Sequence, residues 1–341
     1  MIGLAHGLQM EMLCKGVETE GRVKLLKDKQ CGYIQDHDFY RVLPREKAEG
    51  VLSRSCVMLL RKSGWRTKQS MNPDLERVMK YILVTGAYGG MGRETTDALK
   101  RQGFCVIAMD KQIDAAEENV IPLQVDITDA DSVKRAFEAV KTVTDELCAI
   151  VHFAGIYVLD SLVEIESERF ARTFAVNLYG AFLVNKTFLP LLKRGSRIVI
   201  TTSELAPLDP LPFTGIYAVT KGALDRYAYS LRMELQLLGI SVSVLRAGAV
   251  DTGMLGASTD ALDRFCEETK LYSCNAARFK KIVDSVEARR VPPKKIAQKV
   301  QKMLAAKNPR FAYSINRNPL LLLLNVLPKR FQLWVIKQVL K

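Results

Sequence analysis

The chain of 341 residues is long enough for one large domain or two unequal ones, and its 48% hydrophobic and 26% charged residues are typical of globular proteins. No apolar run approaches the roughly 20 residues that a membrane-spanning helix needs, and the first twelve residues lack the basic and apolar regions of a secretory signal. The seven cysteines are scattered without a Cys-x-x-Cys pair, so we expect free thiols in a reducing, cytoplasmic compartment, with no disulfide framework and no bound metal.

The net charge of +13 is concentrated near the C-terminus. Residues 276–341 hold 16 lysines and arginines against two acidic residues, whereas residues 79–275 are net negative. Such a segment either forms a solvated surface or binds an anionic membrane surface or nucleic acid. It lacks zinc-finger, basic-zipper and aromatic RNA-binding patterns, so we expect no nucleic-acid partner.

Residues 1–78 are predicted to form a short N-terminal appendage that ends in a polar linker. Its conspicuous segments are Lys15-Gly16-Val17-Glu18-Thr19-Glu20, Leu25-Leu26-Lys27-Asp28, Cys31-Gly32-Tyr33-Ile34-Gln35 and Leu43-Pro44. They resemble the end of an EAL-type cyclic-di-GMP phosphodiesterase domain, except that Lys15 replaces an acid and Asp36 replaces a glycine. A (β/α)₈ barrel needs roughly 200 residues. We therefore interpret the segment as a remnant without phosphodiesterase activity, the alternative being a helical extension of no such origin.

From residue 81 onward, apolar runs of strand length alternate with segments of helical length. The expected strands cover 81–85, 104–108, 120–124, 149–153, 197–201, 241–246 and 309–315, and the expected helices lie near 91–102, 131–140, 167–193 and 217–238. Continuous apolar strands that alternate with helices indicate parallel crossovers. We predict an α/β fold of residues 79–341: a doubly wound, Rossmann-type parallel sheet of about seven strands.

A glycine-rich loop follows the first of these strands. It reads Thr85-Gly86-Ala87-Tyr88-Gly89-Gly90-Met91-Gly92 and leads into a helix. Glycines allow a sharp turn and a close phosphate, and a helix N-terminus presents free N–H groups to an anion. The position in the first strand–helix unit indicates a dinucleotide site.

Acidic residues end the next two strands. Asp110 is placed to accept hydrogen bonds from ribose hydroxyls and to repel a 2′-phosphate, which favours NAD over NADP. Lys111 is the one nearby cation that would weaken this preference. Asp126 is predicted to hold the adenine amino group, and each acid has the alternative role of a cap for the segment that follows.

Four polar residues further along suggest acid–base chemistry. Tyr217 and Lys221 lie four residues apart on one helix face, and Ser203 ends the strand 14 residues before Tyr217. A phenol has an ordinary pKa of about 10, which a nearby cation lowers. Tyr217 is therefore predicted to exchange a proton with an alcohol, Ser203 to bond the same oxygen, and buried Asn177 to hold a water that relays protons to Lys221.

Residues 79–341 resemble the short-chain dehydrogenase/reductases. The resemblance rests on the glycine loop, the two adenosine-side acids and the tetrad Asn177, Ser203, Tyr217 and Lys221, all in the family's order. It implies that the cofactor contacts Gly86, Tyr88, Gly90, Met91, Gly92, Asp110, Asp126, Ile127, Ala154, Gly155, Tyr217, Lys221, Val250 and Thr252. Two departures from the family pattern are visible: His152-Phe153 stands where the family usually has two asparagines, and Ala247 stands where it usually has a proline. Neither departure removes a catalytic group. His152 is interpreted as a strand residue.

The region after Thr252 is expected to shape the substrate pocket. We predict a mobile lid over the cofactor at residues 253–285, hinged at Gly253 and Gly256 and helical over 260–285. Its expected lining is Met254, Leu255, Leu262 and Phe265, for which a plain core role is the alternative. Leu320–Leu324 and the amphipathic segment 329–341 predict a helical hairpin that lies on a membrane or packs across a dimer. The tail resembles those of relatives that act on steroids, retinoids or other lipids.

The sequence thus predicts an NAD-dependent enzyme that transfers hydride between the cofactor and a secondary alcohol or ketone, with a steroid- or lipid-like substrate. We expect a homo-oligomer with peripheral membrane contact through the basic tail. The alternatives are a non-catalytic nucleotide-binding regulator of the same fold, against which the complete tetrad argues, and a cyclic-di-GMP signalling protein, against which the absent barrel argues.

Overall fold

The computed structural model describes residues 13–15, 33–35, 79–287 and 290–341, and the chain divides into two units, Met1–Val78 and Met79–Lys341. In the first unit, β1 (Leu13–Lys15) and β2 (Tyr33–Gln35) pair in parallel. The remaining residues of the EAL-like resemblance, and the linker, lie outside the described residues. The EAL-like origin therefore stays a prediction.

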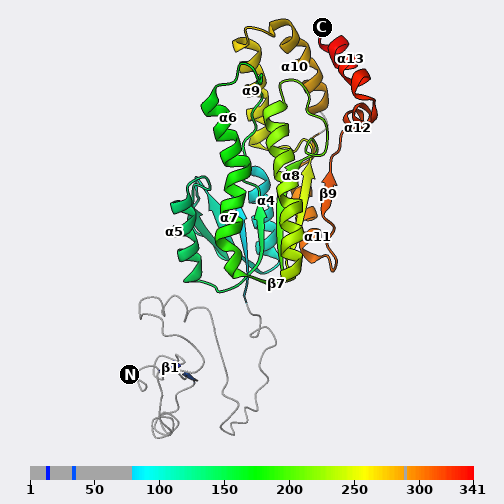
Figure 1. The fold of residues 1–341 in the computed structure, drawn as a ribbon. Helices are drawn as coiled ribbons and strands as arrows, with labels where there is room; N and C mark the ends of the chain where they lie inside the picture. The colour runs from blue at the N-terminus through cyan, green and yellow to red at the C-terminus, as the bar shows by residue number, and fades with distance from the viewer. Residues whose placement is uncertain (1–12, 16–32, 36–78, 288–289) are drawn as a thin grey trace. The chain divides into compact units, whose positions relative to one another are not determined.

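A seven-stranded parallel sheet forms the centre of the second unit (Figure 1). Its strands are β3 (Lys80–Thr85), β4 (Phe104–Asp110), β5 (Val120–Gln124), β6 (Leu147–His152), β7 (Leu192–Ser203), β8 (Ser241–Ala247) and β9 (Ala312–Ile315). They are ordered β5-β4-β3-β6-β7-β8-β9. Side chains of the central strands are buried from both sides, which explains their continuous apolar sequences. The predicted doubly wound fold is confirmed.

Helices cover both faces of this sheet. One face packs against α5 (Ala130–Lys141), α7 (Gly180–Phe188) and α8 (Gly215–Leu235). The other packs against α4 (Gly90–Arg101) and α11 (Pro293–Ala305). α11 was not predicted from the sequence; its first residue is Pro293, and Pro292 is its N-cap. Proline is compatible with the first turn of a helix, and Ile296, Val300 and Met303 then follow with helical spacing into the core.

The helix expected over 167–193 is interrupted. It consists of α6 (Ser167–Phe174), a π-helical turn (Ala175–Tyr179), α7 and a short 3₁₀ turn (Leu189–Leu191). Asn177 lies at the centre of the π-helical turn. Such turns are rare and frequently occur at functional sites.

Two further helix pairs follow β8. The expected lid consists of α9 (Gly253–Glu268) and α10 (Ser273–Glu287), so Gly253 begins a helix and Gly256 lies inside it. Leu262 and Phe265 belong to a buried cluster with Phe213 and Leu340. The expected C-terminal hairpin is present as α12 (Pro319–Val326) and α13 (Lys329–Leu340), and the strand before it is shorter than predicted. Across the described part of the chain, no helix combines the length and apolar character that spanning a membrane requires.

The entry to α12 is attached close to Ser203. The Asn318 N–H donates to Glu204 Oε2 at 2.6 Å, and burial raises the pKa of the Glu204 carboxyl. Asn316 Nδ2 donates to the carbonyl oxygen of Ala249 at 2.8 Å. The C-terminal segment is therefore bonded to the two loops that follow β7 and β8.

Candidate active site

The glycine loop forms a tight cradle between β3 and α4. Gly86 has a φ of +67°, and a Cβ built there would lie 2.6 Å from the backbone nitrogen of Ala154. A Cβ at Gly90 would lie 2.6 Å from Thr252 Cγ2, and one at Gly92 would overlap the Gly86 carbonyl oxygen. These contacts explain why the loop excludes side chains. They also bring Ala154 and Thr252, predicted cofactor residues from two other loops, against it.

The start of α4 is free of competing side chains. Gly89 provides no side-chain cap, and the first turn contains no acidic residue. Unpaired N–H groups and the positive end of the helix dipole therefore remain available to a phosphate group. Tyr88 and Met91 are partly buried against the core below the loop.

The carboxylate of Asp110 is held at the end of β4 beside this loop. Its Oδ2 accepts a hydrogen bond from the Tyr88 N–H at 3.0 Å, and its Oδ1 accepts one from the Lys111 N–H at 2.7 Å. The segment that follows, residues 111–119, contains no helix, and Asp110 bonds its first N–H group, that of Lys111.

A cation near the loop was missed by the sequence analysis. Arg93 pairs with Asp114 at 2.7 Å, and its guanidinium lies 5.6 Å from the centroid of the Tyr88 ring. Its position directly after Gly92 was the available signal. Arg93 is therefore a second basic residue, besides Lys111, near the glycine loop.

Asp126 lies in a second polar cluster, after β5. Its Oδ2 pairs with Lys111 Nζ at 2.8 Å, and its Oδ1 accepts hydrogen bonds from the backbone and hydroxyl of Thr128. Burial alone would raise the pKa of Asp126, but the bonds from Lys111 and Thr128 lower it to about 2. The cap of α5 is Asp129. Ile127 packs closely on Gly180, at the start of α7.

The four tetrad positions lie around the carboxyl end of β7. Ser203 is the last residue of that strand and shares a hydrogen bond with Tyr217. Lys221 Nζ donates to the Thr201 carbonyl at 3.3 Å and lies 5.8 Å from the centroid of the Tyr217 ring. A Cβ built at Gly155 would lie 3.2 Å from both Lys221 Nζ and Asn177 Oδ1. All four positions are thus brought together, with Gly155 between two of them.

Asn177 is 1% exposed, and its amide makes three hydrogen bonds. Its Oδ1 accepts from the Ile156 N–H at 2.8 Å, and its Nδ2 donates to the Ile156 carbonyl at 3.0 Å and to Thr220 Oγ1 at 3.1 Å. As expected for a buried asparagine, Asn177 has hydrogen-bond partners, and those found here are protein atoms. These bonds join the π-helical turn to the segment after β6 and to α8.

The electrostatics of the pair on α8 differ from the sequence expectation. Desolvation by the surrounding protein raises the pKa of Tyr217, which the nearby Tyr157 also raises and the Ser203 hydrogen bond lowers. The expected lowering of this pKa by Lys221 is therefore wrong for the phenol as it is packed here. Burial lowers the pKa of Lys221 itself to about 8. Helical spacing alone does not reveal desolvation, which is the largest effect on both groups.

Other residues near the site were not identified as functional from the sequence. The Tyr157 ring lies 4.8 Å from that of Tyr217. Arg246 of β8 makes a bidentate pair with Asp225 of α8, at 2.9 and 2.7 Å, and Thr202 Oγ1 donates to the same carboxylate. His152 ends β6, as its interpretation as a strand residue requires.

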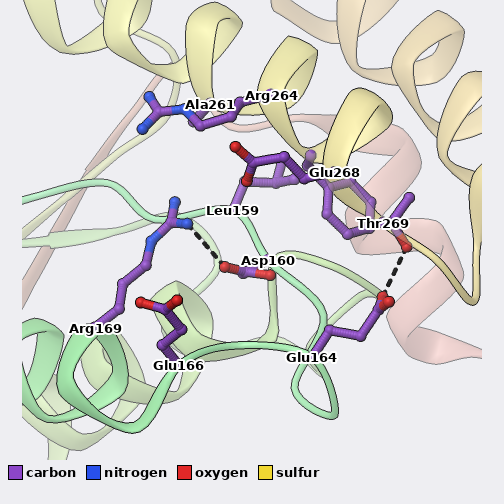
Figure 2. Close-up of a pocket in the computed structure, with 10 residues that line it drawn as sticks. Leu159, Asp160, Glu164, Glu166, Arg169, Ala261, Arg264, Glu268 and Thr269 are labelled. Atoms are coloured by element: carbon purple, nitrogen blue, oxygen red, sulfur yellow. Dashed lines mark hydrogen bonds and ion pairs between the residues drawn. The ribbon is translucent and has the colours of Figure 1, made fainter.

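A separate cavity of about 350 Å³ lies between α9 and the segment around the start of α6 (Figure 2). Charged side chains dominate its lining, including the ion pair of Asp160 with Arg169 at 3.0 Å and the Glu164 carboxylate bonded to Thr269. None of the tetrad residues lines it. The cavity is therefore separate from the four tetrad positions.

Comparisons with known proteins agree with this geometry. The family model described as short chain dehydrogenase matches residues 80–263. Estradiol 17-beta-dehydrogenase 2 of Mus musculus is 30% identical over 286 residues, covering 77% of this chain and 74% of the relative. The 3-ketodihydrosphingosine reductase of Bacteroides thetaiotaomicron is 26% identical over 231 residues, covering 67% and 85%.

A solved structure shows the same fold. A short chain dehydrogenase family protein from Francisella tularensis is 23% identical, with a TM-score of 0.59, over 70% of this chain and 97% of the other. The matched region contains the glycine loop, β3 to β8 and the whole tetrad. The chain therefore belongs to the short chain dehydrogenase family, whose members are oxidoreductases that transfer hydride with NAD(H) or NADP(H).

Proposed function

We propose that this protein is an NAD-dependent dehydrogenase/reductase that interconverts a secondary alcohol and a ketone. The observation that carries the proposal is the meeting of Ser203, Tyr217, Lys221 and Asn177 at the carboxyl end of β7. Ligands of open α/β sheets bind at this edge of the sheet.

The cradle fits a dinucleotide. A Cβ would fill the space at Gly86, Gly90 and Gly92, and the adjoining helix N-terminus has free N–H groups. We assign the pyrophosphate to Gly86, Tyr88, Gly90, Met91 and Gly92. The adenosine half is assigned to Asp110, Asp126 and Ile127, and the nicotinamide half to Ala154, Gly155, Tyr217, Lys221, Val250 and Thr252.

When bound, the nicotinamide supplies or accepts the hydride. Tyr217 holds the proton that moves in the same reaction. Because desolvation raises its pKa, the phenol stays protonated at neutral pH, ready to donate to a ketone oxygen that Ser203 also bonds. In the oxidative direction, the phenol must lose its proton before it accepts one from the alcohol.

Lys221 and Asn177 support this proton transfer. A pKa of about 8 places Lys221 near neutrality, where an amine can both release and accept protons. Gly155 leaves the space between Lys221 Nζ and Asn177 Oδ1 free of a side chain. We propose that the water of a proton relay lies between these two groups.

Asp110 is the basis for the preference for NAD. Two backbone N–H groups hold its carboxylate at the end of β4. A carboxylate there bonds the ribose hydroxyls and repels the extra phosphate of NADP. Lys111 and Arg93 are both paired with acids, Asp126 and Asp114, which reduces their attraction for that phosphate.

We propose an apolar substrate of steroid- or lipid-like size. Tyr157 joins Tyr217 to the buried cluster formed by Leu159, Phe213 and the lid helices. The names of two relatives, an estradiol dehydrogenase and a ketodihydrosphingosine reductase, point to hydrophobic alcohols and ketones.

A cofactor titration combined with a substrate screen tests the function. NADH and NADPH fluorescence would be followed as each binds the full chain, and turnover would be measured with steroid alcohols, long-chain ketones and small secondary alcohols. We expect tighter NADH binding and measurable turnover of an apolar substrate. Tight cofactor binding without turnover of any class would instead favour a non-catalytic nucleotide-binding protein.

The Asp110→Ala variant tests the preference for NAD. Loss of the carboxylate should weaken NADH binding by about tenfold, roughly the value of one charge-assisted hydrogen bond, and leave NADPH binding unchanged or stronger. Asp145→Ala, which removes an exposed acid elsewhere, is the matched control. A several-fold preference of the wild-type protein for NADPH would contradict the assignment.

A further inference from the structure

The C-terminal hairpin presents an exposed apolar surface. We call the outward side of α12 and α13 the tail surface, and its large apolar residues are Leu320, Leu323, Val326, Phe331, Leu333, Trp334 and Val339. Val326 is 83%, Leu333 67% and Trp334 54% exposed. Single exposed apolar residues are normal on a protein surface, but this many large ones on two adjoining short helices indicate an interaction site.

The opposite side of α13 is attached to the body of the second unit. Gln332, Ile336 and Leu340 recur every four residues and therefore share one helix face. Gln332 Nε2 donates to Asp209 at 3.2 Å, Ile336 and Leu340 pack on the lid cluster, and Asn275 Nδ2 donates to the Leu340 carbonyl at 2.6 Å. Figure 1 shows α13 beside α10. The orientation of the helix is thus fixed by contacts, with Leu333, Trp334 and Lys337 facing outward.

The tail surface carries positive charge only. Residues 316–341 contain Arg317, Lys329, Arg330, Lys337 and Lys341 and no aspartate or glutamate. All five cations are exposed, and in the described part of the chain only Lys329 forms a salt bridge, with Asp209. A surface that combines unpaired cations with exposed tryptophan and leucine matches an interface between charged headgroups and hydrocarbon.

We propose that the tail surface binds the headgroup region of an anionic phospholipid bilayer. The cations contact lipid phosphates, while Leu323, Leu333 and Trp334 enter the outer part of the hydrocarbon. A second copy of this chain is a poorer partner, because a symmetric contact would place like charges against each other. A nucleic acid would satisfy the charge but leave the leucines and Trp334 exposed to water.

Trp334 provides a direct measurement. The chain has two tryptophans, Trp65 and Trp334, so Trp65→Phe in the full-length protein leaves Trp334 as the only indole emitter. We expect its emission to shift to the blue with vesicles of phosphatidylcholine and phosphatidylglycerol in a 3:1 ratio. The shift should be much smaller with phosphatidylcholine alone, and 0.5 M salt should weaken it because salt screens the attraction. An unchanged spectrum with the anionic vesicles would overturn the proposal.

Charge reversal tests the basic residues. Arg330→Glu/Lys337→Glu should reduce cosedimentation with the anionic vesicles at least tenfold. Lys294→Glu/Lys295→Glu, which changes the same charge on exposed positions of α11, is the matched control and should bind within twofold of the wild-type protein. Equal losses in the two variants would show that overall charge, and not the tail surface, causes binding, and would overturn the proposal.

Apolar substitutions separate insertion from surface attraction. Leu323→Ser/Leu333→Ser should reduce vesicle binding at least fivefold, whereas Leu237→Ser/Leu238→Ser, on exposed leucines after α8, should not. Light scattering should give the same molar mass for the wild-type and tail variants. If the tail variants instead convert a dimer to a monomer while vesicle binding is unchanged, the surface is a contact between copies and the proposal fails. These readouts need no cofactor or substrate and are independent of the proposed catalytic function.

Discussion

Two features of the surrounding protein shift the pKa of the Tyr217 phenol in opposite directions. Desolvation raises its pKa, and the Ser203 hydrogen bond favours the ionised form. The role proposed for Tyr217, in which the phenol both gives and takes a proton, depends on this balance. The hydroxyl is therefore the part of the side chain on which turnover should depend, while the ring contributes packing against Tyr157.

The Tyr217→Phe substitution tests this division. It keeps the ring and removes the proton carrier, so we expect turnover to fall by at least ~10²-fold while cofactor affinity changes little. Steady-state kinetics and cofactor titration measure the two effects. Tyr227→Phe, which removes another phenol of α8, one that bonds Asn185, is the matched control. Turnover near the wild-type rate in Tyr217→Phe would contradict the proposed role.

His152 links stability to pH. Its imidazole is buried between Thr85 Oγ1, at 3.3 Å, and Asn185 Oδ1, at 2.9 Å. Burial lowers the pKa of His152 to about 4, which the Asn185 hydrogen bond partly opposes. Between pH 6.5 and 4 the unfolded chain therefore binds a proton that the folded protein does not, and the free energy of unfolding must rise with pH across this window.

We expect this one histidine to change the free energy of unfolding by up to about 3 kcal/mol between pH 4 and 6.5, at roughly 1.4 kcal/mol per pKa unit. Urea unfolding of the wild-type protein and of His152→Gln at several pH values measures the contribution as the difference between the two pH slopes. Parallel slopes would mean that His152 is not held neutral in the folded protein.

At the scale of elements, α8 is tied to the sheet by a partly buried ion pair. Asp225 on α8 and Arg246 on β8 form two hydrogen bonds, and Thr202 on β7 contributes a third to the same carboxylate. The pair lies on the helix that carries Tyr217 and Lys221. Disruption of this ion pair should therefore mainly lower the stability of the protein and, to a smaller extent, displace Tyr217 and Lys221.

The Asp225→Ala substitution should destabilise the protein by about 3 kcal/mol, because it leaves Arg246 partly buried without a counter-charge. The double substitution Asp225→Leu/Arg246→Met should recover most of this loss, since it removes both charges and keeps apolar volume. Thermal and urea unfolding of both variants provide the comparison. A double variant as unstable as Asp225→Ala would show that the ion pair itself, and not the uncompensated charge, is required.

Elements differ in how far sequence predicts them. The strands were predictable because burial on both faces demands continuous apolar residues, as in Ile82, Leu83 and Val84. The π-helical turn was not, because it accompanies bonds from Asn177 to Ile156, 21 residues away.

Contacts between residues far apart in the sequence also limit how well the candidate site can be predicted. Order and spacing placed Ser203, Tyr217 and Lys221 together, whereas the sign of the Tyr217 pKa shift depends on how closely other segments pack around the phenol. Tyr157 was missed because its importance arises from a tertiary neighbour, the ring of Tyr217. Arg93 directly follows the glycine loop, but its ion pair with Asp114, 21 residues further along, could not be read from the sequence.

At the scale of the whole molecule, every residue of the candidate site lies in Met79–Lys341. This unit contains the complete seven-stranded sheet and the helices that cover it. The unit should therefore contain all that the chemistry requires.

We expect a chain of residues 79–341 to fold and to keep turnover within about twofold of the full chain. Parallel measurements of melting temperature and steady-state kinetics on both chains test this expectation. A folded 79–341 chain with a large loss of turnover would place part of residues 1–78 in the active site.

The hydrogen bond between Asn318 and Glu204 has a consequence for how related chains diverge. Glu204 directly follows Ser203, and its carboxylate is satisfied by the backbone at the start of α12. A lineage that shed its last two helices would leave this acid without its donor, one residue from the proposed catalytic serine. Among homologous sequences, we therefore expect a glutamate at the position of Glu204 to occur where α12 and α13 are present and to be absent where they are missing.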